Sequence, residues 1–147
     1  SKSCKGFYRS LLNRARCDHW NAGGGAGLAD APSPGSAGQG PYFMSAEDLT
    51  TQAGIGVQQD LALATLIGCT HVERNGHHYV NGMAGAPQAE QRGFLAAHPD
   101  LYEESLGAVR LRIRAGSLAI GSLATPGLGF APEPDFAAMR ATSYPEA

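Results

Sequence analysis

The sequence has few charged residues and no excess of basic ones. Asp, Glu, Lys and Arg make up 16% of the 147 residues, and the formal net charge is −2. A chain with this balance lacks the basic surface that binds nucleic acids and anionic membranes. It also lacks an uninterrupted apolar run of about 18 residues, which a membrane-spanning helix requires. We therefore expect a cytoplasmic protein with neither nucleic-acid nor membrane partners.

Cysteine is also scarce, and its spacing excludes two common uses. Cys4, Cys17 and Cys69 are an odd number of thiols, and no two of them form a C-x-x-C pair. Such wide separation does not suit a cysteine-based zinc site. His71, His77 and His78 are no better as ligands, because two adjacent histidines cannot easily face one ion. We expect reduced thiols and no zinc.

Glycine and proline are abundant, but they are concentrated in one segment. Residues 21–41 are rich in both and contain Asp30 as their one charged residue. Such a segment has few side chains to bury and a high backbone entropy to lose on folding. We interpret it as a loop inserted between two structured pieces.

The first half of the chain alternates between helical and extended patterns. Apolar residues spaced three to four apart predict helices, and short apolar runs that end in polar residues predict strands. The helices are predicted over 6–21 and 57–67, and the strands over 1–5, 41–44 and 69–73. Gly68 is expected to end the second helix. Repeated βα units of this kind predict an α/β fold with a parallel sheet.

The second half has a different character, so we divide the chain into residues 1–82 and 83–147. A helix is predicted over 87–104, an antiparallel hairpin over 109–122 with its turn at Ala115-Gly116, and an extended tail from Thr125. Arg110, Arg112 and Arg114 share one face of the hairpin. This row favours a solvated strand face over an anion-binding site.

Three motifs in this order resemble the enolase superfamily, in its mandelate racemase and muconate-lactonizing branch. Lys2-Ser-Cys-Lys5-Gly6 resembles the K-x-x-K-x-G-G motif on the sixth barrel strand, and Phe43-Met-Ser-Ala-Glu47-Asp48-Leu lies where the seventh strand ends. Thr70-His71-Val72-Glu73 resembles the end of the eighth strand. The hairpin and the following Thr125-Pro-Gly-Leu-Gly resemble the family's C-terminal tail.

The sequence departs from the family pattern at each motif. A single glycine follows Lys5, and no histidine corresponds to the one that racemases carry at strand seven. His71-Val72-Glu73 stands where dipeptide epimerases have an aspartate motif. The departures leave the subgroup open.

The resemblance implies the last three βα units of a (β/α)8 TIM barrel, followed by a β-hairpin tail. It also implies Mg²⁺-dependent removal of the proton alpha to the carboxylate of a small substrate. The outcome is racemisation, cycloisomerisation or dehydration, as in an isomerase or a lyase. In the family, the Mg²⁺ ligands come from strands that precede the sixth. We therefore expect no metal ligands in this chain, and an N-terminal part that is missing from it.

The resemblance also assigns roles to individual side chains. Lys2, Glu47, Asp48 and Glu73 are the candidate catalytic residues, and Lys5 and His71 are the candidate substrate-binding residues. Simpler interpretations remain beside these. Glu47-Asp48 suits the start of a helix, where acidic residues favour the helix dipole, and Glu73 suits a salt bridge with Arg74.

Two functions of other classes remain as alternatives to the enzyme. The chain is either a non-catalytic, truncated remnant of such an enzyme or a small α/β binding domain. Three parallel strands with open edges would expose unpaired backbone groups and apolar faces. A remnant of this kind is expected to associate, for example as a homo-oligomer.

Overall fold

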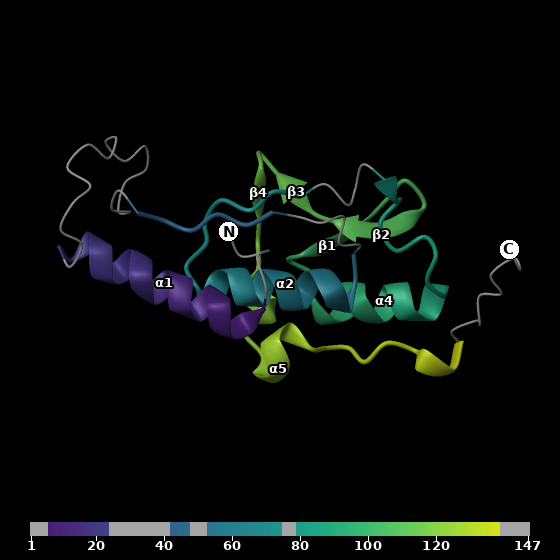
Figure 1. The fold of residues 1–147 in the computed structure, drawn as a ribbon. Coiled ribbons are helices and arrows are strands. Elements are labelled where there is room, and N and C mark those ends of the chain that lie inside the picture. Colours follow the sequence, from purple (N-terminus) through teal and green to yellow (C-terminus); the bar gives the residue numbers. More distant parts are fainter. Residues whose placement is uncertain (1–5, 24–41, 48–52, 75–78, 139–147) are drawn as a thin grey trace, which may run out of the picture.

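Helices and short strands occupy different sides of the molecule. The computed structural model describes residues 6–23, 42–47, 53–74 and 79–138 of the chain. The strands lie above the main helices in Figure 1, and the C-terminal segment passes below them. The fold is therefore mixed α/β, as the sequence predicts at the level of fold class. None of the helices in this part of the chain is both long and apolar enough to span a membrane.

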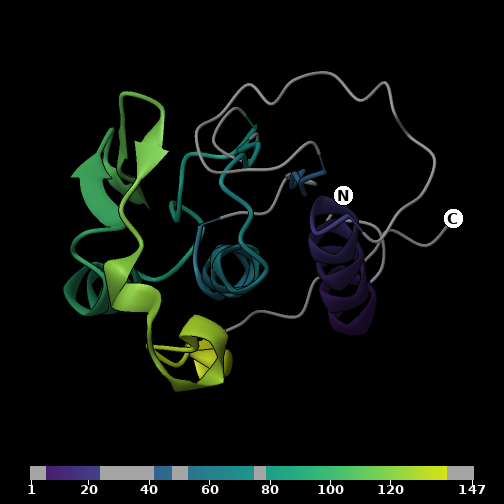
Figure 2. The same ribbon diagram turned by 90° about the vertical axis from the view of Figure 1, so that its left-hand side faces the viewer.

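The described residues form helices, 3₁₀ turns and short strands. The helices are α1 (Phe7–Asn21), α2 (Ile55–Leu66), α4 (Gln88–Ala97) and α5 (Pro126–Gly129), with 3₁₀ turns η1 (Gly121–Leu123) and η2 (Phe136–Ala138). The strands are β1 (Tyr102–Ser105), β2 (Ala108–Leu111), β3 (Ile113–Arg114) and β4 (Ser117–Leu118). Figure 2, a view rotated by 90°, shows α2 between α1 and the group formed by α4 and the strands.

The two helices predicted in the first half are confirmed. Helix α1 covers nearly the whole of the predicted 6–21, and α2 begins two residues before the predicted 57–67 and ends one residue before its end. Gly68 follows α2 with a φ of 67°, a left-handed conformation that favours glycine after a helix. A side chain at Gly68 would also collide with the guanidinium of Arg14.

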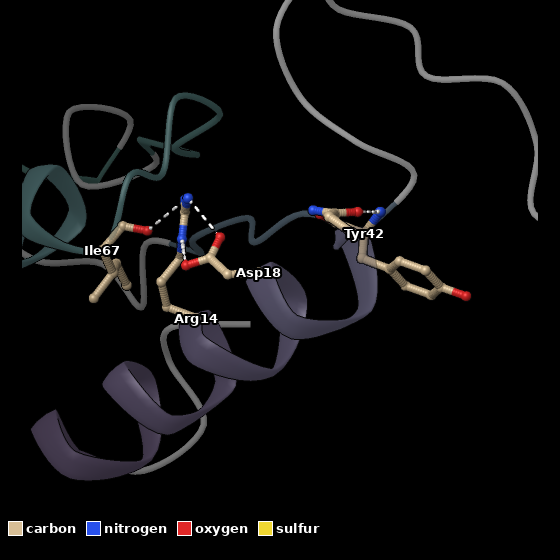
Figure 3. A network of polar contacts seen from close by, with 5 residues as sticks. Arg14, Asp18, Tyr42 and Ile67 are labelled. Carbon is tan, nitrogen blue, oxygen red and sulfur yellow. Dashed lines mark hydrogen bonds and ion pairs between the residues drawn. The ribbon is translucent and has the colours of Figure 1, made fainter. Parts of the chain in front are cut away.

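The apolar face predicted for α1 from Phe7, Leu11, Leu12 and Ala15 is only partly buried. Leu11 and Cys17 pack against the core, whereas Phe7 and Leu12 are exposed. Arg14 explains this orientation, because its Nη1 donates to the carbonyl of Ile67, 3.2 Å away, at the end of α2. Asp18 holds the same guanidinium from the next turn of α1 (Figure 3). The docking of α1 is thus partly polar, which apolar periodicity does not reveal.

The described residues on either side of the Gly- and Pro-rich segment lie close together. The side chain of Asn21 donates to the carbonyl of Tyr42 at 2.7 Å and accepts from its amide at 3.1 Å (Figure 3). The Trp20 and Tyr42 rings also lie 5.4 Å apart. Residues 24–41, like the strand predicted over 1–5, lie outside the described residues.

The predicted helix over 87–104 is too long. Helix α4 ends at Ala97, and β1 occupies Tyr102–Ser105. Pro99 accounts for the break, because proline disfavours helical geometry in the residue before it and lacks an amide hydrogen for the helix. The shorter helix leaves β1 to pair antiparallel with β2, with Tyr102 opposite Leu111 and Ser105 opposite Ala108.

The predicted hairpin is correct at its turn and wrong along its first strand. Strands β3 and β4 pair around Ala115 and Gly116, whose φ values of 48° and 76° are both left-handed. Val109 to Leu111 belongs to β2 instead and pairs with β1. Arg112 and Arg114 form ion pairs with Glu103 on β1. The arginine row therefore links the two hairpins by salt bridges.

The main core lies where α2, α4 and the first hairpin meet. Phe94 of α4 is fully buried, and its ring meets Tyr102 edge-on with centroids 6.2 Å apart. The Tyr102 hydroxyl accepts from the Gly54 amide at 3.2 Å, just before α2. Burial raises the pKa of Tyr102, although its hydrogen bond with Gly54 lowers it in part. Tyr102 therefore joins the second half of the chain to the start of α2.

A buried polar network attaches the C-terminal segment to the end of α4. The two ring nitrogens of His98 contact the Ser122 hydroxyl, at 3.0 Å, and the carbonyl of Ala131. Asp100 accepts from the Ser122 amide at 2.9 Å. Burial raises the pKa of Asp100, but the hydrogen bonds from the Ser122 side chain and amide outweigh it and hold the pKa below its ordinary value. The segment predicted as an extended tail therefore folds back on the domain.

We expect this network to make stability depend on pH in the acid range. Because the pKa of Asp100 is lowered by folding, its carboxylate stabilises the fold above the ordinary value of 3.8, and this contribution is lost as the pH falls below it. Asp100→Asn removes the titrating group. The stability difference between wild type and Asp100→Asn, measured by urea unfolding, should therefore shrink between about pH 6 and about pH 3. An unchanged difference would show that Asp100 is not linked to folding.

Candidate functional site

Two short extended segments run side by side in the same direction. Ala46 donates its amide to the carbonyl of His71 and accepts at its own carbonyl from the amide of Glu73, both at 3.0 Å. This pattern makes Ala46 and Val72 a parallel bridge. Helix α2 lies between the two segments in the chain, so the order is extended segment, helix, extended segment, joined by one isolated parallel bridge. The sequence predicted strands at 41–44 and 69–73, and the structure shows one bridge just beyond the first and within the second.

One face of this pair of segments packs against the helices. Ala46 and Val72 lie in register on this face, since residues paired in a parallel bridge point to the same side. Met44 and Ala46 are buried in a cluster with Ala64 of α2 and with Ile67, which directly follows the helix. The helix therefore covers this face and leaves the other uncovered.

The uncovered face carries three of the six residues predicted for the site. Side chains alternate between faces, so those that flank Ala46 and Val72 point away from α2. All of the following are exposed: Phe43, Ser45, Glu47, His71 and Glu73. The Phe43 and His71 rings confirm that the two segments share this face, because their centroids lie 6.3 Å apart. We call these five residues the open face.

The bridge places two carboxylates in adjacent positions on the open face. Glu47 follows Ala46 and Glu73 follows Val72, so the two are in register across the pair. Neighbouring strands are separated by about 4.8 Å, which brings both side chains within reach of one small molecule. Paired carboxyl groups at such a separation are typical of general acid–base sites. His71 stands next to them and contacts the Thr70 hydroxyl through Nδ1 at 3.2 Å.

A hollow of about 990 Å³ adjoins the second segment. His71 and Glu73 lie along one wall, and the hairpin of β3 and β4 forms the opposite wall with Ile113, Leu118 and Ile120. The volume is in the range of small-molecule sites, which combine mostly apolar walls with a few polar groups. The hollow therefore has the size and the composition to hold a small organic molecule next to Glu73.

An ion pair beneath the hollow fixes the end of the second segment. Arg74 pairs with Asp60 of α2, and their side chains are 6% and 20% exposed. A mostly buried pair of this kind holds the backbone after Glu73 in place, because breaking it would leave a buried charge. The sequence interpretation assigned no role to Asp60. The sequence does carry a signal for a partner of Asp60, since it is the one charged residue in the apolar run 57–67.

The structure brings together three of the six predicted site residues. Glu47, His71 and Glu73 share the open face, whereas Lys2, Lys5 and Asp48 lie outside the described residues. Within the described ranges, no three His, Cys, Asp or Glu side chains are grouped so that they could hold a metal ion. The open face, as far as the structure describes it, is therefore a site with acid–base groups and without a metal cluster.

Comparison with known proteins adds no family assignment. No family model matches the chain, and searches of curated proteins and of solved structures return no significant similarity. The function of the chain is therefore inferred from the geometry of the open face and from the sequence motifs.

Proposed function

We propose that this chain forms the C-terminal part of an enolase-superfamily enzyme that removes the proton alpha to the carboxylate of a small substrate. The observation that carries the proposal is the parallel bridge between Ala46 and Val72. It gives the order strand, helix, strand that the last units of a (β/α)8 barrel would have. It also places Glu47 and Glu73 at the carboxyl ends of the two segments, where α/β barrels carry their chemistry.

The exposure of the open face supports a barrel origin. In a closed barrel the face that helices do not cover points into the interior, where side chains fill the space. Here Phe43, a large aromatic residue on that face, is exposed. Among the described residues, Phe43 is 57% exposed, as an inward-facing aromatic residue of a barrel would be without the strands opposite it.

The proposed chemistry assigns distinct tasks to the open face and to the lysines. A carbon acid next to a carboxylate is weak, so its deprotonation needs a positioned base and stabilisation of the negative charge that develops. Glu73 and Glu47 supply proton-transfer groups, but two carboxylates repel an anionic substrate. Lys2 and Lys5 are the cations in the proposal that would balance this charge, and Lys2 is a third proton-transfer group.

The described residues do not provide a binding site for Mg²⁺. The family implies Mg²⁺ next to the substrate carboxylate, but Glu47, His71 and Glu73 do not form a group that could hold it. The described part of the chain therefore does not fit the metal, and we derive no step through it.

One observation favours a second candidate, a small-molecule binding domain without catalysis. The hollow beside Glu73 is walled by apolar residues of β3, β4 and the following segment, which belong to the chain itself. A site of this kind needs no further strands. In this case His71 and Glu73 would orient a bound ligand, and no proton would be exchanged.

Deuterium exchange distinguishes the two functions. The protein expressed from its whole reading frame is incubated in D₂O with Mg²⁺ and either mandelate or an N-acyl amino acid, and the alpha-proton signal is followed by NMR. Loss of this signal supports the enzyme. Retention of the alpha-proton signal in both compounds, together with changes in the NMR chemical shifts of His71 when they are added, would overturn the enzymatic function and support the binding domain.

A further inference from the structure

The turn between β1 and β2 carries an exposed leucine whose backbone conformation is one that leucine rarely adopts. Leu106 and Gly107 have φ values of 52° and 76°, the left-handed pair of a two-residue hairpin turn. Such a turn favours Asn-Gly, and leucine in the left-handed region is strained. The Leu106 side chain is also 77% exposed. The left-handed backbone of Leu106 costs stability, and its exposed side chain gains none from burial.

The turn is held firmly in this conformation. Asn81 donates from its side chain to the carbonyl of Leu106 at 3.0 Å, and Arg110 donates to the side-chain oxygen of the same Asn81. Leu106 is therefore a fixed apolar projection. Tyr79, two residues before Asn81, is also exposed, at 74%.

A hollow of about 520 Å³ lies directly beside this projection. Helix α4 forms one wall with Gln88 and Arg92, and the hairpin forms the other with Glu104 and Leu106. Gln91 of α4 holds the helix and the hairpin together beside the hollow. Its side chain accepts from the Val109 amide and donates to the Ala86 carbonyl, both at 3.0 Å. The volume of the hollow is larger than that of one leucine side chain.

We propose that a second copy of this chain occupies the hollow, with its Leu106 inserted between α4 and the hairpin. A twofold axis through the hollow places the hairpin of each copy against α4 of the other. Each copy then gives one projection and receives one, which is the self-complementarity that a twofold interface requires. The proposal concerns a surface separate from the open face and does not depend on the proposed function.

Charge complementarity favours a second copy over an unrelated partner. Arg92 is exposed on the α4 wall and Glu104 on the hairpin wall, and neither makes an ion pair within the described part of the chain. The twofold arrangement brings Arg92 of each copy to Glu104 of the other. The same operation that inserts Leu106 thus pairs both charges twice.

Leu106→Asn is the first test, because it removes the projection and relieves the turn. Asn-Gly is the favoured sequence for this turn, so the variant should fold at least as stably as wild type. By sedimentation velocity we expect wild type to dimerise with increasing concentration and Leu106→Asn to dimerise at least about tenfold more weakly. Leu66→Asn, at an exposed leucine on α2, is the control and should dimerise like wild type. A monomeric wild type, or a Leu106→Asn variant that dimerises equally well, would overturn the proposal.

Mixing two charge variants is the second test. In the Arg92→Glu variant alone, two glutamates face each other at each contact of the interface. In the Glu104→Arg variant alone, two arginines face each other there, so each variant should be monomeric. An equimolar mixture restores opposite charges at both contacts and should dimerise like wild type. A mixture that stays monomeric would overturn the twofold arrangement. Mixing also serves as a control, because it cannot correct an effect that each substitution has within its own copy.

Discussion

Changing Glu73 to glutamine is expected to lower the rate of alpha-proton exchange by about 10²- to 10⁴-fold, the usual contribution of a positioned acid or base. Glutamine keeps the size of the side chain and removes its ability to accept or release a proton. Glu73 is exposed on the open face, so the change should leave the fold intact. The rate is measured in D₂O by NMR, on the protein expressed from its whole reading frame.

The matched control is Glu133→Gln, which removes a carboxylate from an exposed position in the C-terminal segment. This variant should exchange the alpha proton at the wild-type rate. If both variants retain that rate, Glu73 does not transfer the proton. If both lose it equally, the effect is one of overall charge rather than of the open face.

Changing Phe94 to alanine is expected to lower the free energy of unfolding by about 3–5 kcal/mol, as for other fully buried phenylalanines. Phe94 has no exposed surface and lies edge-on to Tyr102, so its loss leaves a cavity between α4 and β1. A small domain has a total stability of about 5–15 kcal/mol, so the loss is a large fraction. Urea unfolding followed by circular dichroism measures it.

Phe136→Ala serves as the control, because this ring is 58% exposed in η2. We expect it to change stability by no more than about 0.5 kcal/mol. A Phe94→Ala variant as stable as the Phe136→Ala variant would contradict the core as described. The hairpin of β1 and β2 would then not be packed against α4.

The sequence predicted the first half of the fold better than the second. Helices α1 and α2 follow from residues spaced three to four apart, and Gly68 marks the end of α2. The second half was harder because Pro99 divides one apparently helical run into a helix and a strand. The strand pairing of Val109 could not be read from its alternation, because alternation defines a face and not a partner strand.

The site was predictable in its residues and only partly in its arrangement. The motifs identified Glu47, His71 and Glu73, but the sequence alone did not show that they share one face. That fact depends on the register of Ala46 with Val72, a long-range contact that local patterns do not specify. The ion pair of Arg74 with Asp60 was missed for the same reason, since 14 residues separate the two.

The register of these two segments is the central claim, and backbone NMR tests it most directly. The parallel bridge predicts a nuclear Overhauser contact between Ala46 and Val72, together with slow hydrogen exchange at the amides of Ala46 and Glu73, which are both hydrogen-bonded. Side-chain contacts of Ala46 with His71 or Glu73 in place of Val72 would mean a register shifted by one residue, which moves Glu73 to the opposite face from Glu47. That result, or fast exchange at both amides, would contradict the site.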